Sequence, residues 1–259
     1  MTKKTFLPVI IILLITSPSL SATQFYQQGF SVEQIRLGLD AEFFDRMITW
    51  DEDQSETSSL RSYLFSLSLG YEILEGTSVT AVLGYSLSNF DDMIFNKLPF
   101  SLELNTGHID GIVFGGKALI EIINLADFTL SARGQFIYYL GFEEQWDIPG
   151  LNVEGTANGN PSWARLTAGP KISFHATPYL RPYVTVNYDR LWGKFKMTET
   201  IEELTGEQEI KIESQSYFNF SIGTLYEIID RLDLKAEATL LPLEDQIGLG
   251  IAVGALYSF

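Results

Sequence analysis

The sequence holds one group of side chains suited to acid–base chemistry. Asp91 and Asp92 end one segment of alternating apolar residues, and His108 and Asp110 begin the next such segment. If the two segments pair as neighbouring strands, the four side chains meet at one rim, where carboxylates and an imidazole can activate water for hydrolysis. The simpler alternative is a surface ion pair, and we therefore expect no catalytic site.

A second set of polar side chains recurs on one face of the alternating segments. Its members are Arg36, Asp40, Glu42, Lys117, Arg133, Gln135, Lys171, Asn187, Lys235 and Glu237. In a narrow barrel interior these charges should pair, because an unpaired charge there costs on the order of several kcal/mol. This face therefore predicts an ionic network that plugs the interior. The alternative is a narrow path for ions or small solutes, helped by the small residues Gly248, Gly250, Ala252 and Gly254 of the last segment.

Two of the long polar connections are acidic. They carry Asp51, Glu52, Asp53, Glu56, Glu199, Glu202, Glu203, Glu207, Glu209 and Glu213. Carboxylate clusters can bind Ca²⁺ or Mg²⁺, but neither connection has the fixed ligand spacing of a known calcium loop. We therefore interpret them as solvated surface charge, and we expect neither a metal nor a cofactor.

One long connection is apolar instead. Its residues Met93, Ile94, Phe95, Leu98, Pro99 and Phe100 would be costly to leave in water. They must pack onto other loops, dip into a membrane interface or bind a partner. We expect this connection, and above all Met93, Ile94, Phe95, Leu98 and Phe100, to bind a partner protein.

The elements that would position these groups are strands, because the apolar residues repeat every second position. In "IRLGLDAEF", for example, Ile35, Leu37, Leu39 and Phe43 share one face. About ten such segments occur, with eight or twelve as alternatives. They lie at about 35–43, 62–73, 78–88, 109–122, 128–142, 162–176, 182–195, 214–228, 232–241 and 247–259.

The connections between these segments alternate in length. Short ones such as "LEGT" and "ATPYL" separate long polar ones such as "KMTETIEELTGEQEIKIES". The face opposite the apolar one is mostly Ser, Gly and Thr, whereas the outer face of a soluble sandwich would carry more charge. Both features favour an all-β fold: a transmembrane antiparallel up-and-down β-barrel. Two aromatic girdles are expected, with all four tryptophans at the ends of the strands that lead into long loops.

The first 22 residues predict a secretory signal peptide, cut after Ser21 or Ala22, and residues 23–259 predict a single barrel domain. The sequence has 17 basic and 33 acidic residues, and loss of Lys3 and Lys4 with the leader leaves a net charge of −18. Such an acidic chain argues against nucleic acid as a partner. It has no cysteine, so disulfides and thiolate metal sites are excluded.

The leader, the alternating segments and the closing "ALYSF" together resemble the small outer-membrane β-barrels of Gram-negative bacteria. The resemblance implies an integral outer-membrane location, with outer-membrane lipid and lipopolysaccharide as surroundings. It also implies that Tyr257 and Phe259 form the C-terminal signal read by the barrel-assembly machinery. The likeness covers the whole chain after the leader and is specific to the class, not to one family.

The Asp and His cluster is similar in composition to that of the omptins, ten-stranded outer-membrane proteases. Omptins place an aspartate pair across a cleft from an Asp and His pair, whereas here the candidates share one wall and the opposing Asp189 has no histidine companion. The function expected from the sequence is a largely plugged barrel that presents acidic loops for binding or anchors a surface assembly. A narrow pore is the first alternative, and an omptin-like hydrolase is the second.

Overall fold

The structure is a computed structural model that divides the chain into two units, Met1–Glu33 and Gln34–Phe259. It describes residues 34–50, 56–91, 93–95, 98, 102–104, 107–147, 155–242 and 247–259. The leader expected at residues 1–22, the acidic stretch 51–55, and the site candidates Asp92 and Phe100 lie outside the described residues. Within those residues there is no helix long and apolar enough to cross a membrane.

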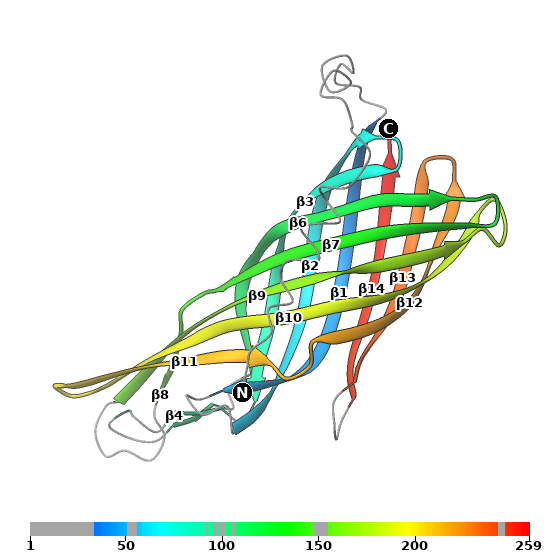
Figure 1. Cartoon of the computed structure of the whole chain (residues 1–259). Helices are drawn as coiled ribbons and strands as arrows, with labels where there is room; N and C mark the ends of the chain where they lie inside the picture. Colours follow the sequence, from blue (N-terminus) through cyan, green and yellow to red (C-terminus); the bar gives the residue numbers. More distant parts are fainter. Residues whose placement is uncertain are drawn as a thin grey trace, which may run out of the picture. The chain divides into compact units, whose positions relative to one another are not determined.

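Ten antiparallel strands of the second unit form a closed ring (Figure 1). They are β1 (Ile35–Trp50), β2 (Glu56–Leu74), β3 (Thr77–Asp91), β6 (His108–Asn124), β7 (Phe128–Gly141), β9 (Gly155–Phe174), β10 (Leu180–Ile201), β12 (Phe218–Ile229), β13 (Leu232–Pro242) and β14 (Ile247–Ser258). The last strand pairs with the first from Arg36↔Ser258 to Asp45↔Leu249. The expected ten-stranded up-and-down barrel is confirmed.

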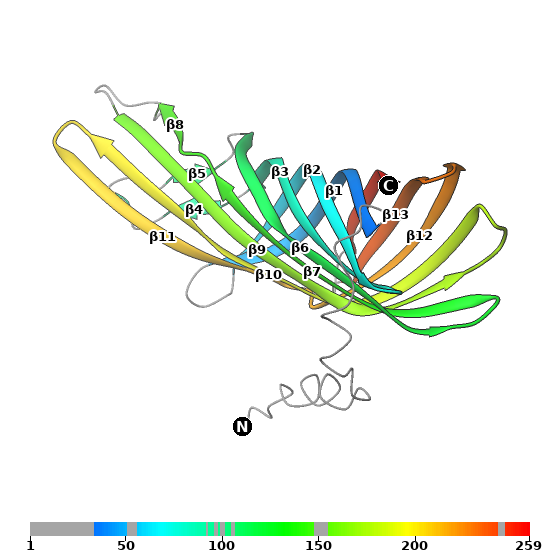
Figure 2. The ribbon, with the colours of Figure 1, turned by 90° about the horizontal axis from the view of Figure 1, so that it is seen from above.

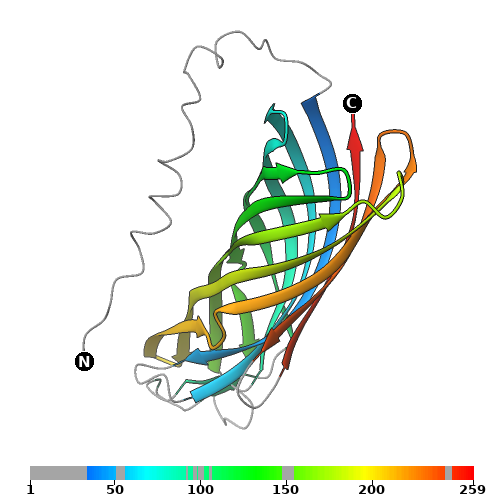
Figure 3. The ribbon, with the colours of Figure 1, turned by 45° about the vertical axis from the view of Figure 1, so that its right-hand side comes forward.

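The two ends of the barrel differ in their connections (Figure 3). At the turn end, β2 and β3 are joined by two residues, and so are β12 and β13. Gly76 in the first of these turns has a φ of 74°, which glycine adopts without the steric cost that other residues incur. The longer connections lie at the opposite end, called the loop end. The predicted alternation of short and long connections is therefore confirmed.

Four further strands, β4 (Met93–Phe95), β5 (Leu102–Leu104), β8 (Glu144–Asp147) and β11 (Leu204–Ser214), lie at the loop end. β11 forms a hairpin with β10 and also pairs with β1 through Ile48↔Ser214 (Figures 1 and 2). The expectation of a polar loop over this segment was wrong. Period-two alternation continues through both strands of the hairpin. Met197 on β10 and Ile210 and Ile212 on β11 are therefore buried, and their neighbours along each strand face outward.

The outward face of the ring is apolar and exposed. Leu39, Leu67, Leu83 and Ile222 are each at least 60% exposed, and their neighbours along each strand point inward. Near the turn end, exposed aromatic residues include Tyr226, Tyr257 and Phe259. Toward the loop end the exposed aromatic side chains include Tyr63, Tyr85, Tyr188 and Phe218.

The expectation that all four tryptophans form a girdle was wrong. Trp50 and Trp163 are buried inside the barrel, 4% and 0% exposed, and Trp146 is half-buried against the same cluster. Strand parity decides this placement, because Trp163 shares the inward parity of Arg165 and Thr167 on β9. Proximity to a strand end therefore does not by itself indicate that an aromatic residue faces lipid.

Candidate functional site in the barrel interior

The loop-end half of the interior is filled by apolar side chains. This apolar plug comprises Phe44, Ile48, Leu60, Phe90, Ile109, Val113, Tyr139, Trp163, Leu191 and Phe195, with Met93, Phe95 and Leu98. Its rings make direct contact: Phe195 meets Phe90 and Phe95 edge-on, with centroids 5.2 and 5.4 Å apart, and Tyr139 stacks on Trp163 at 5.2 Å. Aromatic pairs in these arrangements add to the stabilisation from burial alone.

The expected partner-binding connection is part of this plug. Met93 and Phe95 are fully buried and Leu98 is 7% exposed, so these side chains are not free to bind a partner. Among the residues of this connection that the structure describes with their side chains, Ile94 alone is exposed, at 41%. The physical reason is that β4 pairs with β5 and turns Met93 and Phe95 toward the same side, onto Phe195 of β10.

The turn-end half of the interior carries ion pairs between strands, called the inner charge network. Lys117 Nζ lies 2.9 Å from Asp40 Oδ2, and Arg133 Nη1 lies 3.0 Å from Glu237 Oε2. Arg36 pairs with Glu72 in the same zone. The structure thus brings together the candidates Arg36, Asp40, Lys117, Arg133, Lys235 and Glu237 on one inward face.

Sequence reasoning missed several members of the network. Arg165 donates to Glu42 over 2.6 Å, and Arg181 donates to Asp233 over 2.9 Å. Asn187 accepts a hydrogen bond from Arg133 Nε at 3.0 Å, which places this candidate in the network as well. The sequence does contain a signal for these residues. Continuing the alternation of inward-facing positions to the ends of each strand adds Arg165, Arg181 and Asp233 to the predicted network.

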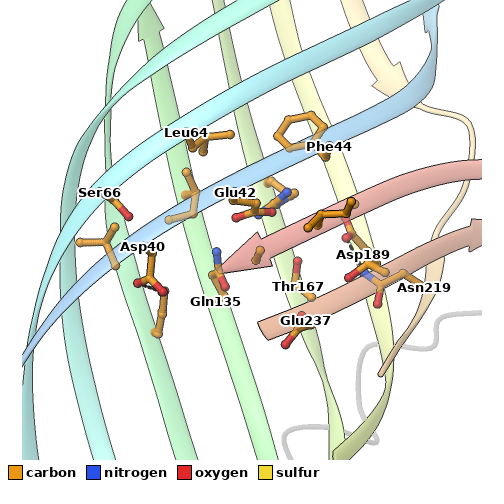
Figure 4. Close-up of a pocket in the computed structure, with 18 of the residues that line it drawn as sticks. Asp40, Glu42, Phe44, Leu64, Ser66, Gln135, Thr167, Asp189, Asn219 and Glu237 are labelled. Atoms are coloured by element: carbon orange, nitrogen blue, oxygen red, sulfur yellow. Dashed lines mark hydrogen bonds and ion pairs between the residues drawn. The ribbon is translucent and has the colours of Figure 1, made fainter. Parts of the chain in front are cut away.

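A buried ion pair marks the junction of the two halves. Arg46 Nη2 donates to Asp189 Oδ1 at 3.0 Å, and Asn219 Nδ2 donates to Asp189 Oδ2 at 2.6 Å. The guanidinium groups of Arg46 and Arg165 both lie over the ring of Phe44, at 5.5 and 5.0 Å. Figure 4 shows Phe44, Asp189 and Asn219 among the side chains that converge from several strands on a cavity. The cavity has a volume of about 70 Å³, and Arg46 and Arg165 also line it. Only a few water molecules fit in a space of this size.

A larger cavity of about 240 Å³ lies closer to the turn end and is called the vestibule. It is lined by Arg36, Asp40, Ser68, Thr80, Lys117, Arg133, Gln135, Thr167, Lys171, Tyr183, Lys235 and Glu237, among others. Side-chain exposure falls from 36% at Arg36 to 21% at Arg133 and 6% at Arg165. The vestibule therefore opens at the turn end and is closed toward the loop end.

The glycine strip of β14 does not leave a channel. A Cβ added at Gly254 would lie 2.5 Å from Asp40 Oδ1, and one at Gly248 would lie 3.2 Å from Leu241 Cβ. The space beside these glycines is therefore taken by side chains of the neighbouring strands β1 and β13.

The Asp and His candidates lie on the outward face, away from both cavities. Asp91 Oδ2 is 3.5 Å from Arg61 Nη1, and Asp110 accepts a hydrogen bond from the Tyr85 hydroxyl. The His108 ring packs edge-on against Tyr63, with centroids 5.7 Å apart. The register Leu87↔Asp110 does place the two segments side by side, as expected. Each described candidate nevertheless has its own partner, so no shared acid–base geometry forms among them.

Two acidic residues of the β10–β11 hairpin, Glu207 and Glu209, pair with lysines on its outer surface. Glu199 is buried, so the expectation of solvated surface charge was wrong for this residue. Lys194 Nζ lies 2.9 Å from Glu209 Oε2, and Lys196 Nζ lies 3.0 Å from Glu207 Oε1. The hydrogen bond to Glu209 raises the pKa of Lys194. Among the described residues, no group of three or more His, Asp and Glu side chains is arranged to hold a metal ion.

No protein-family model matches the chain, and no curated protein is similar to it in sequence. Among solved structures, the translocator domain of the autotransporter NalP from Neisseria meningitidis is 13% identical, with a TM-score of 0.48 and coverage of 92% of this chain and 91% of that one. The outer membrane protease OmpT from Escherichia coli is 11% identical, with a TM-score of 0.48 and coverage of 91% and 100%. A major outer membrane protein from Thermus thermophilus is 10% identical, with a TM-score of 0.42 and coverage of 87% and 99%. At 10 to 13% identity, the activities of these proteins cannot be assigned to this chain.

Proposed function

We propose that this chain is an integral outer-membrane β-barrel that is closed to solutes and serves as a scaffold for its loop-end extension. The outward apolar face supports a membrane location. Side chains such as Leu39, Leu67 and Ile251 are more than half exposed, and each would be stabilised by transfer from water to lipid by about 25 cal/mol per Å² of apolar surface. A ring without free edges satisfies its own backbone hydrogen bonds, as a lipid environment requires.

The main support for a barrel closed to solutes is the apolar plug. Ile48, Leu60, Trp163, Leu191 and Phe195 each are 0% exposed, and they come from β1, β2, β9 and β10. Together with the other plug residues they occupy the loop-end half of the interior, through which a conducting pathway would have to pass. A hydrated path through this zone would expose to water apolar side chains that are now shielded from it, which is unfavourable.

The β10–β11 hairpin is the part of the barrel that such a scaffold presents. It is fixed to the barrel twice, through β10 and through the pairing of β11 with β1. A protein partner at the loop end would therefore meet a braced surface of paired Lys and Glu side chains, such as Lys196 and Glu207. The residues Tyr257 and Phe259 lie outward at the turn end, where an assembly signal would be accessible.

Single-channel recording in planar lipid bilayers tests the closed state. The wild-type protein should give no stepwise currents. The double variant Phe90→Ala, Phe195→Ala removes two contacting rings from the plug and should raise the frequency of current steps. Its matched control is Phe114→Ala, which removes a ring that is 47% exposed on the outward face and should leave the protein silent. Steady wild-type conductance would overturn the proposal.

A further inference from the structure

The vestibule contains more positive charge than its own carboxylates can balance. Five cations line it, namely Arg36, Lys117, Arg133, Lys171 and Lys235, against the two carboxylates Asp40 and Glu237. Arg36 is matched by Glu72 and Lys117 by Asp40. This surplus occurs in a chain with 33 acidic and 17 basic residues, where an excess of cations in one cavity runs against the composition.

For the remaining three cations the vestibule offers one carboxylate, Glu237, which pairs with Arg133 and Lys235. Glu237 Oε2 lies 3.0 Å from Arg133 Nη1 and 3.7 Å from Lys235 Nζ, and it also accepts a hydrogen bond of 2.7 Å from the Tyr183 hydroxyl. Three positive charges thus face one negative charge, which leaves the vestibule with an excess of two positive charges.

Lys171 is the cation with the weakest protein partner. Its Nζ lies 4.2 Å from the centroid of the Tyr183 ring, a cation–π contact. In the part of the chain that the structure describes, no carboxylate forms an ion pair with it. A cation–π contact stabilises a cation less than a carboxylate or phosphate partner does.

We propose that the vestibule binds a phosphate monoester group that enters from the turn end. Such a group carries between about 1.5 and 2 negative charges at neutral pH and offers three strong acceptor oxygens, which matches the excess charge and the donors of Arg133, Lys171 and Lys235. Ser68, Thr80 and Gln135 add neutral donors on the same walls. The proposal goes beyond the scaffold role, because it concerns the opposite end of the barrel.

Titration calorimetry on the full-length protein in uncharged detergent micelles tests this site, with glycerol 3-phosphate as the soluble probe. We expect saturable binding of one phosphate per chain that weakens as salt is added. Lys171→Gln and Lys235→Gln should each weaken binding by about tenfold or more, the effect of losing one charge-assisted hydrogen bond. The substitution Lys171→Arg keeps the positive charge and should retain most of the wild-type affinity. The matched control Lys196→Gln removes an exposed lysine of the hairpin and should bind like the wild type.

Phosphatidic acid added to the same micelles distinguishes a lipid headgroup from a soluble ligand. Binding of the lipid alone, lost in Lys171→Gln, would assign the site to a headgroup. Binding of glycerol 3-phosphate, lost in the same variant, would assign it to a soluble ester. The proposal is overturned if neither probe binds up to the millimolar range, or if Lys171→Gln and Lys196→Gln bind alike. Heat-dependent gel migration of each variant confirms that the barrel has folded.

Discussion

The buried pair of Arg46 and Asp189 gives a sharp test of the interior, because a nearly identical pair is exposed on the outer surface. The substitution Asp189→Asn keeps the size of the side chain and leaves Arg46 buried without its carboxylate. The side chains of Arg46 and Asp189 are 3% and 4% exposed, and Arg46 Nη2 lies 3.0 Å from Asp189 Oδ1. Arg61 and Asp45 lie 3.2 Å apart, but they are 49% and 38% exposed.

The expected magnitudes follow from the surroundings and not from the distances. At 3.0 Å and an effective dielectric constant of about 20, Coulomb attraction amounts to about 5 kcal/mol, whereas in water at 3.2 Å it is about 1 kcal/mol. Breaking a buried pair on one side typically costs about 3–5 kcal/mol, and breaking an exposed pair costs about 0–1 kcal/mol. Asp189→Asn should therefore lower the free energy of unfolding by several times more than Asp45→Asn.

Equilibrium unfolding in guanidinium, with the protein in lipid vesicles, measures both variants. Tryptophan fluorescence is a suitable signal because Trp163 is fully buried in the plug. We expect the midpoint to fall strongly for Asp189→Asn with an unchanged slope, and to fall little for Asp45→Asn. Equal losses in the two variants would refute the assignment of Arg46 and Asp189 to a water-poor interior.

Two further predictions concern packing and assembly. Gly254→Ala would place a Cβ against Asp40 Oδ1 and should cost about 1–3 kcal/mol in unfolding free energy. A Cβ added at Gly134 meets nothing within 4 Å, so Gly134→Ala should cost little, and equal midpoints for the two variants would contradict the filled strip. Phe259→Ala should reduce the fraction of heat-modifiable, folded protein in isolated outer membranes while leaving refolding from urea into micelles intact. A defect in both assays would indicate a structural role for the ring, not an assembly signal.

Period-two alternation was enough to predict the ten strands of the barrel, but the β10–β11 hairpin was interpreted as a polar loop. Alternation predicted that the inward-facing charges form ion pairs, but not that Lys117 pairs with Asp40 or Arg133 with Glu237. Which residues face inward follows from each strand alone, whereas the partner of each charge depends on the tilt and stagger of strands far apart in sequence. The placement of Trp163 was nevertheless missed, since an apolar residue near a strand end can face lipid or a packed interior, and Met197 was missed because its segment was interpreted as a loop. The vestibule could not be predicted at all, because it depends on where the plug ends.

The plug and the outward band together have a consequence for depth. Around the loop-end half, the interior is apolar and the surface carries groups such as Asp45, Arg61 and Lys194; around the turn-end half, the arrangement is reversed. The barrel thus changes from the pattern of a membrane protein to that of a soluble one along a single set of strands. In a bilayer, we expect this boundary to set the immersion depth. Deeper insertion of the loop end would bring charged groups into lipid, and movement the other way would leave apolar side chains in water.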